Sequence, residues 1–345
     1  MAEISVIIPV YNVAEYLSKS LDSALMQTFG DIEVICVNDC SKDNSLAVLK
    51  EYTARDERVK IVDLKENKGV SNARNMGLKE ACGKYVYFLD ADDWIDADYL
   101  EKMHAAMVEK NVDIVLNTNA VCHRLGTQDS PFLPHYTLNF FENDYIRGSE
   151  AVCRLIWNVW ANFYSKSFVD RIGAQFPVGY PYGEDLYFQL LTYLNTDKVY
   201  VIRNSQYHYL VRESGASKTF EDANMGHIEQ LIRILNLMGE YVLNKSITDQ
   251  NLPKLFVPEA YPPLSASKKD ELILQIRDYI AKIEPIYQKT RGYYPPEEQE
   301  IFDGLLNDFE NAKNIDFLHK IKMSRLKKYA AGFLRDHLKK KGLMK

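Results

Sequence analysis

The first hundred residues alternate between short apolar runs and helical patterns, and this alternation limits the folds that the chain can adopt. The predicted strands are residues 4–10, 32–37, 59–64 and 85–89. The predicted helices between them are residues 14–28, 45–52 and 71–81. Strands that alternate with helices predict a parallel sheet with helices on both faces. We therefore expect an α/β fold built around a mainly parallel sheet.

The regular alternation weakens further along the chain. A helix is expected at 96–111 and a strand at 113–117, whereas residues 120–211 mix aromatic residues, prolines and short apolar runs. Helical patterning takes over from about residue 219. We therefore expect two parts, a sheet-based domain at 1–215 and a smaller, mostly helical region at 216–345.

Polar side chains follow three of the predicted strands at the point where each strand ends. Tyr11-Asn12 follows the first strand, Asn38-Asp39 the second, and Asp90-Ala91-Asp92-Asp93 the fourth. In sheets of this kind, ligands bind beyond the carboxyl ends of the strands. The sequence therefore predicts a binding site at this edge of the sheet.

Three carboxylates within four residues, Asp90, Asp92 and Asp93, repel one another at the end of a buried strand. A divalent cation would relieve this repulsion, and carboxylate oxygens suit Mg²⁺ or Mn²⁺, which also bind substrate phosphates. The alternative is that these acids only cap the helix expected to begin near Asp96. On the residues alone, both interpretations stay open.

Five segments in this order resemble glycosyltransferase family 2, whose catalytic domain has the Rossmann-like GT-A fold. The segments are ISVIIPVYN (4–12), VNDCSKDNS (37–45), NKGVSNARNMGL (67–78), FLDADD (88–93) and YGEDLYF (182–188). The chain departs from the family in one place, since Cys40 stands where a glycine is usual. The resemblance covers about residues 3–215. It implies an inverting enzyme that moves a hexose or N-acetylhexosamine from a nucleotide diphosphate sugar, most often a UDP-sugar, to an acceptor hydroxyl.

The resemblance also implies which residues hold the nucleotide. Pro9, Tyr11 and Asn12 would line the nucleotide pocket, with the Tyr11 ring against the base. Asp39 would accept a hydrogen bond from the base, and Arg74 would reach the base or the diphosphate. The alternatives are that Asp39 is a helix cap and that Arg74 is an ordinary surface residue.

The same resemblance implies that the acidic segment contacts the donor sugar and the metal ion. Asp90 and Ala91 would lie at the ribose or sugar of the donor, and Asp92 would be the main ligand of Mn²⁺ or Mg²⁺. His208, in a predicted strand before a polar loop, would lie near the metal and diphosphate as a second ligand. The alternative for His208 is a packed histidine. Arg212, which follows the same strand, could close over the phosphates.

Glu184 and Asp185 carry the predicted catalytic step. Inverting transfer needs one carboxylate near the acceptor hydroxyl to take its proton as the new bond forms. The resemblance assigns this role to Asp185 and a positioning role to Glu184. The alternative is that both acids only begin the helix expected at 186–194, where acids are stabilised by the helix N-terminus. The two interpretations are compatible.

Composition limits the partners and the compartment. The net charge of −6 gives no reason to expect a nucleic-acid partner. The five cysteines are odd in number and form no C-x-x-C pair, which argues against a disulfide framework or a structural zinc site. Without a signal-peptide pattern or an apolar run of about 20 residues, we expect a cytoplasmic protein whose membrane contact, if any, is peripheral.

The final segment, residues 319–345, holds ten Lys or Arg residues and one acid, with apolar residues near helical spacing. A basic amphipathic pattern of this kind suits an anionic membrane surface, here the inner face of the cell membrane. A lipid-linked oligosaccharide would then be a natural acceptor. The alternative is a helix that packs on its own domain or on a second copy in a homodimer.

Two other functions compete with sugar transfer. A sugar nucleotidyltransferase would share the parallel sheet, but such enzymes usually carry a glycine-rich basic loop where this chain has PVYNVAEYL. A non-catalytic scaffold with a decayed transferase fold would not need Arg74, Asp92 and Asp185 together. A dehydrogenase is disfavoured because no G-x-G-x-x-G follows the first strand. The sequence does not identify the transferred sugar, the acceptor or the linkage.

Overall fold

A computed structural model describes residues 2–124, 130–131, 144–146, 148, 158–181 and 183–212, with isolated positions at 234, 237, 241 and 284. The chain divides into two compact units, Met1–Asp222 and Ala223–Lys345. The first unit holds every element discussed below. The domain boundary expected near residue 215, the helical region after it and the basic segment at 319–345 lie outside the described residues.

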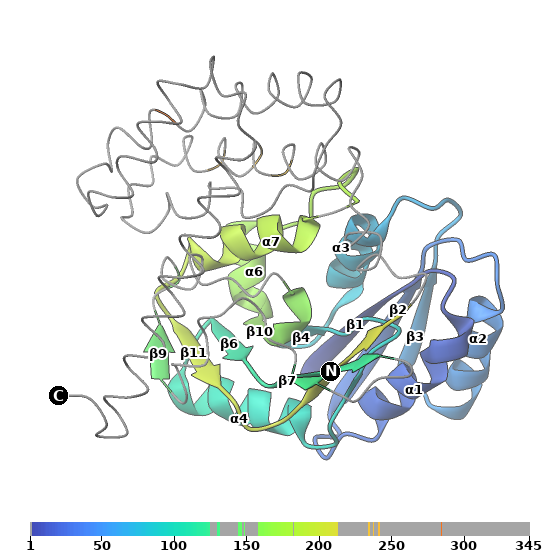
Figure 1. Cartoon of the computed structure of the whole chain (residues 1–345), viewed down its shortest axis with the longest axis horizontal. Helices are drawn as coiled ribbons and strands as arrows, with labels where there is room; N and C mark the ends of the chain where they lie inside the picture. Colours follow the sequence, from blue (N-terminus) through green and yellow to red (C-terminus); the bar gives the residue numbers. More distant parts are fainter. Residues whose placement is uncertain are drawn as a thin grey trace. The chain divides into compact units, whose positions relative to one another are not determined.

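The core of the first unit is a large, mainly parallel sheet (Figure 1). Within the described residues it has eight strands, in the order β3 (Val59–Asp63), β2 (Ile32–Asn38), β1 (Ile4–Val10), β4 (Tyr85–Phe88), β10 (Asn162–Ser165), β6 (Ile114–Asn117), β11 (Val199–Ile202) and β9 (Asp144–Ile146). Strands β3, β2, β1 and β4 are mutually parallel, as their alternation with helices predicted. The expected α/β fold class is confirmed.

Two strands of this sheet run antiparallel to their neighbours. Strand β10 lies antiparallel between β4 and β6, and the edge strand β9 lies antiparallel to β11. The sequence between 151 and 211 had no regular strand–helix alternation to predict this insertion. The carboxyl ends of β1, β2 and β4 still open onto the same edge.

Helices cover both faces of the sheet. In Figure 1, the helices form two groups, one on each face of the sheet. The first group is α3 (Val70–Glu80), α6 (Lys166–Ile172) and α7 (Glu184–Tyr193), and the second is α1 (Ala14–Leu25), α2 (Ser45–Arg55) and α4 (Tyr99–Lys110). Helix α1 buries Leu17, Leu21 and Ala24, the apolar face expected from their spacing.

Helix α3 lies close to the sheet because of Gly77. A Cβ atom at this position would clash with the Ile7 side chain of β1. The absence of a side chain therefore lets the helix backbone approach β1 closely. This contact fixes the helix that carries Arg74 and Asn75, two residues of the site described below.

A second, smaller sheet has the order β5 (Trp94–Ile95), β12 (Tyr207–Val211), β7 (Ala120–Arg124) and β8 (Ser130–Pro131). Strand β5 follows the acidic segment directly, and its Trp94 pairs with His208 of β12. Because β5 occupies residues 94–95, helix α4 begins at Tyr99 and not at 96 as expected. No helix among the described residues is long and apolar enough to cross a membrane.

Candidate functional site

Parallel pairing brings the ends of three strands together. Val10 of β1 lies opposite Asn38 of β2, and Ile7 of β1 lies opposite Phe88 of β4. The residues that follow these strands therefore share one edge of the sheet. The clustering of polar residues predicted at this edge is what the strand register produces.

The loops after β1 and β2 are tied to each other by Asn12. Its backbone N–H donates to Ser41 Oγ at 3.1 Å, and its Oδ1 accepts from the Lys42 backbone N–H at 2.7 Å. Asn12 has a φ of 52°, which asparagine tolerates better than most residues. Pro9 is partly buried, and Tyr11 is 46% exposed, so its ring is open to a ligand.

Asp39 is buried and holds the turn before α3. Its Oδ1 accepts from the Lys68 backbone N–H at 3.0 Å and its Oδ2 from that of Gly69 at 2.8 Å. Gly69 has a φ of 85° and precedes the first residue of the helix. Both carboxylate oxygens thus have backbone partners in the turn before α3, so Asp39 braces this turn and does not cap the helix itself. The contact between Asp39 and a base stays a prediction.

Cys40, the departure from the family pattern, has a φ of 59°. This is the left-handed region that glycine adopts without strain and that a residue with a Cβ adopts at a cost. The Lys42 ammonium donates to its Sγ at 3.2 Å. The loop therefore keeps the backbone conformation that a glycine would adopt, although the residue is not glycine.

Arg74 lies at the centre of a buried cluster of three carboxylates. Its Nη1 donates to Asp185 Oδ1 at 2.5 Å and to Glu184 Oε1 at 3.0 Å, and its Nη2 donates to Asp90 Oδ1 at 2.9 Å. The guanidinium also faces the Phe176 ring, 5.3 Å from its centroid. Arg74 was expected to reach the base or the diphosphate. In the structure its charge is used to hold carboxylates from two distant parts of the chain.

Burial controls the ionisation of this cluster. Burial raises the pKa of Asp185 to about 8, although the neighbouring Arg74 acts in the opposite direction. Burial likewise raises the pKa of Glu184. The three carboxylates raise the pKa of Arg74 despite its own burial, so it stays cationic. A carboxyl group with a raised pKa is a better proton acceptor once it is ionised.

The second oxygen of Asp185 is also fixed. Asp185 Oδ2 accepts from the Val159 backbone N–H at 3.2 Å. Val159 begins a short 3₁₀ helix, η2 (Val159–Ala161), that leads into β10. Asp185 itself lies in the first turn of α7, where the helix N-terminus favours a negative charge.

The segment that leads into α7 is anchored to α3. The Asn75 side chain donates to the Phe176 carbonyl and accepts from the Phe176 N–H, each at 2.8 Å. Phe176 then stacks on Phe188 of α7 with ring centroids 4.1 Å apart. Asn75 therefore positions the start of the segment that delivers Glu184 and Asp185.

The acidic turn after β4 gives each of its residues a different environment. Asp92 Oδ2 lies 2.5 Å from Arg212 Nε, and burial raises the pKa of Asp92. Ala91 is buried. Asp90 keeps a quarter of its side chain exposed while it contacts Arg74.

Asp93 is buried and structural. Its Oδ2 accepts from the Tyr207 hydroxyl at 2.6 Å and its Oδ1 from the Leu210 backbone N–H at 2.8 Å. Burial, together with Asp92 and Asp90, raises the pKa of Asp93 well above its usual range. Asp93 therefore attaches strand β12 to the acidic turn.

The acidic turn fits a Mg²⁺ or Mn²⁺ ion bound together with phosphates. Within the described part of the chain, no three His, Cys, Asp or Glu side chains converge to form a metal-binding group. Ions of this kind, however, are commonly held by one or two carboxylates, with water and substrate phosphates as the other ligands. Asp92 is a partly buried carboxylate paired with the Arg212 guanidinium, and its neighbour Asp90 opposes its ionisation. These properties are compatible with a bound divalent cation.

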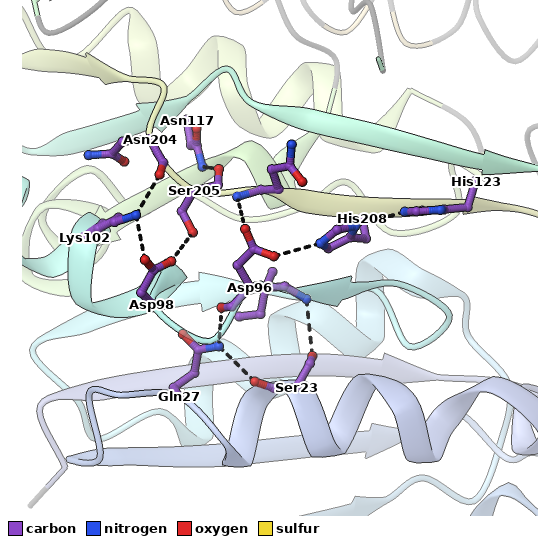
Figure 2. Close-up of polar contacts among 12 residues, drawn as sticks. Ser23, Gln27, Asp96, Asp98, Lys102, Asn117, His123, Asn204, Ser205 and His208 are labelled. Atoms are coloured by element: carbon purple, nitrogen blue, oxygen red, sulfur yellow. Dashed lines mark hydrogen bonds and ion pairs between the residues drawn. The ribbon is translucent and has the colours of Figure 1, made fainter. Parts of the chain in front are cut away.

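His208 has protein partners on both ring nitrogens (Figure 2). Its Nε2 lies 2.9 Å from Asp96 Oδ1, and its Nδ1 lies 2.9 Å from His123 Nε2. The ring also stacks on Trp94 with an interplanar angle of 6°. These contacts agree with the packed-histidine alternative. A metal-ligand role, which would require one of these hydrogen bonds to break, stays a prediction.

Sequence reasoning missed Asn75 and did not predict the partners of Asp93 and Arg212. Asp93 was named only as one of three carboxylates that a cation would relieve, and Asn75 lay next to Arg74 without a signal. Arg212 was expected to close over the phosphates, and its pairing with Asp92 spans 120 positions. Only the run of acids could have indicated Asp93. The partners of Asn75 and Arg212 depend on chain segments that meet in the folded protein.

A family model described as "Glycosyl transferase family 2" matches residues 5–159. A glycosyltransferase from Streptococcus pneumoniae serotype 4, GlyA, is 35% identical over 259 residues, which is 71% of this chain but 36% of that protein. The uncharacterized glycosyltransferase EpsJ of Bacillus subtilis is 28% identical over 293 residues, 80% of this chain and 83% of that protein. The chain thus spans about a third of the first relative's length and most of the second's.

Solved structures share the fold. A crystal structure of Staphylococcus aureus TarS, residues 1–349, in complex with UDP has a TM-score of 0.70 at 21% identity, covering 95% of this chain and 92% of that one. A further TarS complex contains UDP-GlcNAc and has a TM-score of 0.71. The mannosyltransferase PcManGT from Pyrobaculum calidifontis, in complex with GDP-Man and Mn²⁺, has a TM-score of 0.54 at 15% identity and covers 94% of this chain and 87% of that one.

Proposed function

Because this chain belongs to glycosyltransferase family 2, we propose that it transfers a hexose or N-acetylhexosamine from a UDP-sugar to an acceptor hydroxyl with inversion at the anomeric carbon. The observation that carries this proposal is the buried cluster of Arg74, Glu184 and Asp185 at the carboxyl edge of the sheet. This cluster lies on the side where donors bind in open α/β sheets.

The donor side of the proposal rests on the strand ends. Tyr11 is exposed beside the loops that Asn12 ties together. TarS, with a similar fold, is found in complex with UDP and with UDP-GlcNAc. We propose that the nucleotide lies over the ends of β1 and β2, with Asp39 and Tyr11 at the base and Asp90 toward the ribose or sugar.

Asp185 is the proposed general base. One of its oxygens takes the proton of the acceptor hydroxyl while the acceptor oxygen forms its bond to the anomeric carbon. The bond from that carbon to the diphosphate breaks, and the leaving nucleotide keeps the electron pair. A pKa of about 8 makes Asp185 a stronger base than an ordinary aspartate.

Arg74 and Val159 orient the base. Arg74 and the Val159 N–H each bind a different oxygen of Asp185, so the carboxylate cannot rotate freely. Glu184 shares Arg74 and restrains the guanidinium from the other side. A rigidly held base costs less entropy when the acceptor arrives.

We propose that Asp92, with Asp90 beside it, holds Mg²⁺ or Mn²⁺. When bound, such an ion stabilises the negative charge that develops on the leaving diphosphate. PcManGT, which shares the fold, was solved with Mn²⁺ and GDP-Man. The acceptor we propose is a glycan or a lipid-linked oligosaccharide at the inner face of the cell membrane.

The test is a panel of UDP-sugars and GDP-mannose with Mn²⁺ present, measured as transfer to soluble acceptors and as donor hydrolysis. Asp185→Asn should lower transfer about a hundredfold or more, because it removes the proton acceptor. UDP affinity should change little. Asp92→Asn, or removal of divalent ions with EDTA, should abolish activity, and added Mn²⁺ should restore the EDTA-treated wild type.

The matched control is Asp170→Asn, the same change at an exposed aspartate of α6 paired with Lys166. This variant should transfer sugar at the wild-type rate. If Asp185→Asn transfers sugar at the wild-type rate, Asp185 is not the general base. Full transfer activity after removal of tightly bound metal would refute the proposed role of the divalent cation.

A further inference from the structure

The carboxylate of Asp92 lies beside a positively charged side chain, the guanidinium of Arg212. Arg212 Nε lies 2.5 Å from Asp92 Oδ2, and the two side chains are 18% and 19% exposed. The two opposite charges form an ion pair beside the acidic turn. An ion pair that is partly exposed to solvent is more easily exchanged than a fully buried one.

An aromatic ring supports the cation in this position. The guanidinium carbon of Arg212 lies 5.3 Å from the centroid of the Tyr16 ring on α1. A cation over a tyrosine face is attracted by the ring quadrupole. Arg212 is therefore held from two sides, by Asp92 and by Tyr16.

Strand β12, which Arg212 directly follows, is fixed to the acidic turn. Asp93 accepts from Tyr207 and Leu210 of β12, and Asp96 accepts from the Gln206 N–H and faces the His208 ring (Figure 2). The backbone carbonyl of Asp96 also accepts from the side chain of Gln27, which follows α1, at 2.7 Å. Because the strand is attached at two aspartates of the turn region, Arg212 is presented to Asp92 by the fold itself.

We propose that Arg212 is the resident counter-ion of Asp92 and that a divalent cation binds at Asp92 by displacing it. This inference rests on the proposed function, which places the metal at Asp92. A guanidinium and a divalent ion repel each other, so the two occupy one carboxylate in turn. Asp92 is then ready for metal only in the fraction of molecules in which Arg212 has moved away.

The consequence is a metal affinity that is lowered in the absence of donor. The apparent dissociation constant of a ligand rises in inverse proportion to the fraction of protein competent to bind it. If Arg212 occupies Asp92 in about nine molecules of ten, Mn²⁺ binds about tenfold more weakly than it would without Arg212. The donor phosphates, as extra ligands of the ion, would overcome this competition.

The test measures Mn²⁺ binding to the full chain without nucleotide, from the electron paramagnetic resonance signal of free Mn²⁺. Arg212→Gln should bind Mn²⁺ about tenfold more tightly than wild type, which corresponds to about 1.4 kcal/mol. Arg212→Lys, which keeps the charge as a compact ammonium without a planar fork, should tighten binding by a smaller factor. This second variant carries the test if the first does not fold.

Arg55→Gln is the matched control. Arg55 pairs with Glu51 and lies 5.7 Å from the Tyr52 ring, so it repeats the acid and ring environment of Arg212 at the surface. Its removal changes the net charge equally and should leave Mn²⁺ binding unchanged. If both Gln variants bind Mn²⁺ more tightly to the same extent, the effect comes from the net charge of the protein and not from the position of Arg212.

Asp92→Asn separates this inference from the proposed function. If Asp92→Asn abolishes Mn²⁺ binding but Arg212→Gln leaves it unchanged or weaker, the competition is refuted and the metal site stands. If Asp92→Asn binds Mn²⁺ as well as wild type, the metal does not bind at Asp92 and both proposals fall. Tightening in Arg212→Gln that disappears when Asp92→Asn is added supports the exchange.

Discussion

Replacement of Arg74 by methionine should destabilise the protein strongly, and the loss should grow with pH. The Arg74 side chain is 4% exposed and contacts three carboxylates, so its removal leaves buried negative charges without a counter-ion. Breaking a buried ion pair in this way costs about 3–5 kcal/mol. For a unit of this size each kcal/mol lowers the melting temperature by about 2–4 °C, which gives a fall of about 6–20 °C.

The pH dependence tests the electrostatic reasoning directly. Burial raises the pKa values of Glu184 and Asp185, so in the variant both can take up protons in mildly acidic solution and relieve their repulsion. Calorimetry or circular dichroism should therefore show a larger loss at about pH 8.5 than at about pH 5.5. A double variant, Arg74→Met with Asp185→Asn, should recover part of the loss at the higher pH.

Arg58→Met provides the comparison. Arg58 pairs with Asp56 at 2.7 Å, but both side chains are partly exposed, and such pairs contribute at most about 1 kcal/mol. Its melting temperature should stay near wild type at both pH values. An equal loss for Arg74→Met at both pH values, with no recovery in the double variant, would mean that lost packing and not unbalanced charge explains the effect.

Four further predictions follow from the site and the sequence. The rate of transfer should rise along an acidic limb with an apparent pKa near 8, because Asp185 must lose its proton to act as a base; a flat profile between about pH 6 and 9 would exclude this assignment. Since burial raises the folded pKa of Asp185 above the usual value of an aspartate, the stability contributed by its proton is lost as pH rises toward 8, and Asp185→Asn should reduce this fall in melting temperature. Cys40→Gly should raise stability by about 0.5–1 kcal/mol in chemical denaturation, because glycine adopts the φ of 59° without strain; a less stable variant would show that the cysteine side chain contributes more than the strain costs. The intact chain should cosediment with anionic liposomes at low salt and be released at high salt through residues 319–345, whereas a chain ending near residue 318 should stay soluble and active; truncation that unfolds the protein would make this segment a packing element.

The sequence by itself determined the layout of the sheet and the edge at which the site forms. Apolar runs and helical spacing predicted β1 to β4 with α1 to α3 between them, because each pattern depends on residues close together in the chain. Parallel pairing then brings Asn12, Asp39 and Asp90 to one edge, since parallel strands all end on the same side. These conclusions need only local patterns and the geometry of a parallel sheet.

The tertiary structure alone decided what each side chain contacts. Arg74 and Glu184 are 110 residues apart, and only the packing of α3 beside α7 makes them partners. The same holds for Asp92 with Arg212 and for His208 with Asp96. These residues lie in or next to strands β5 and β12, which pair in the small sheet. A residue's chemical type limits which partners it accepts, but the choice among them depends on long-range packing that no local pattern records.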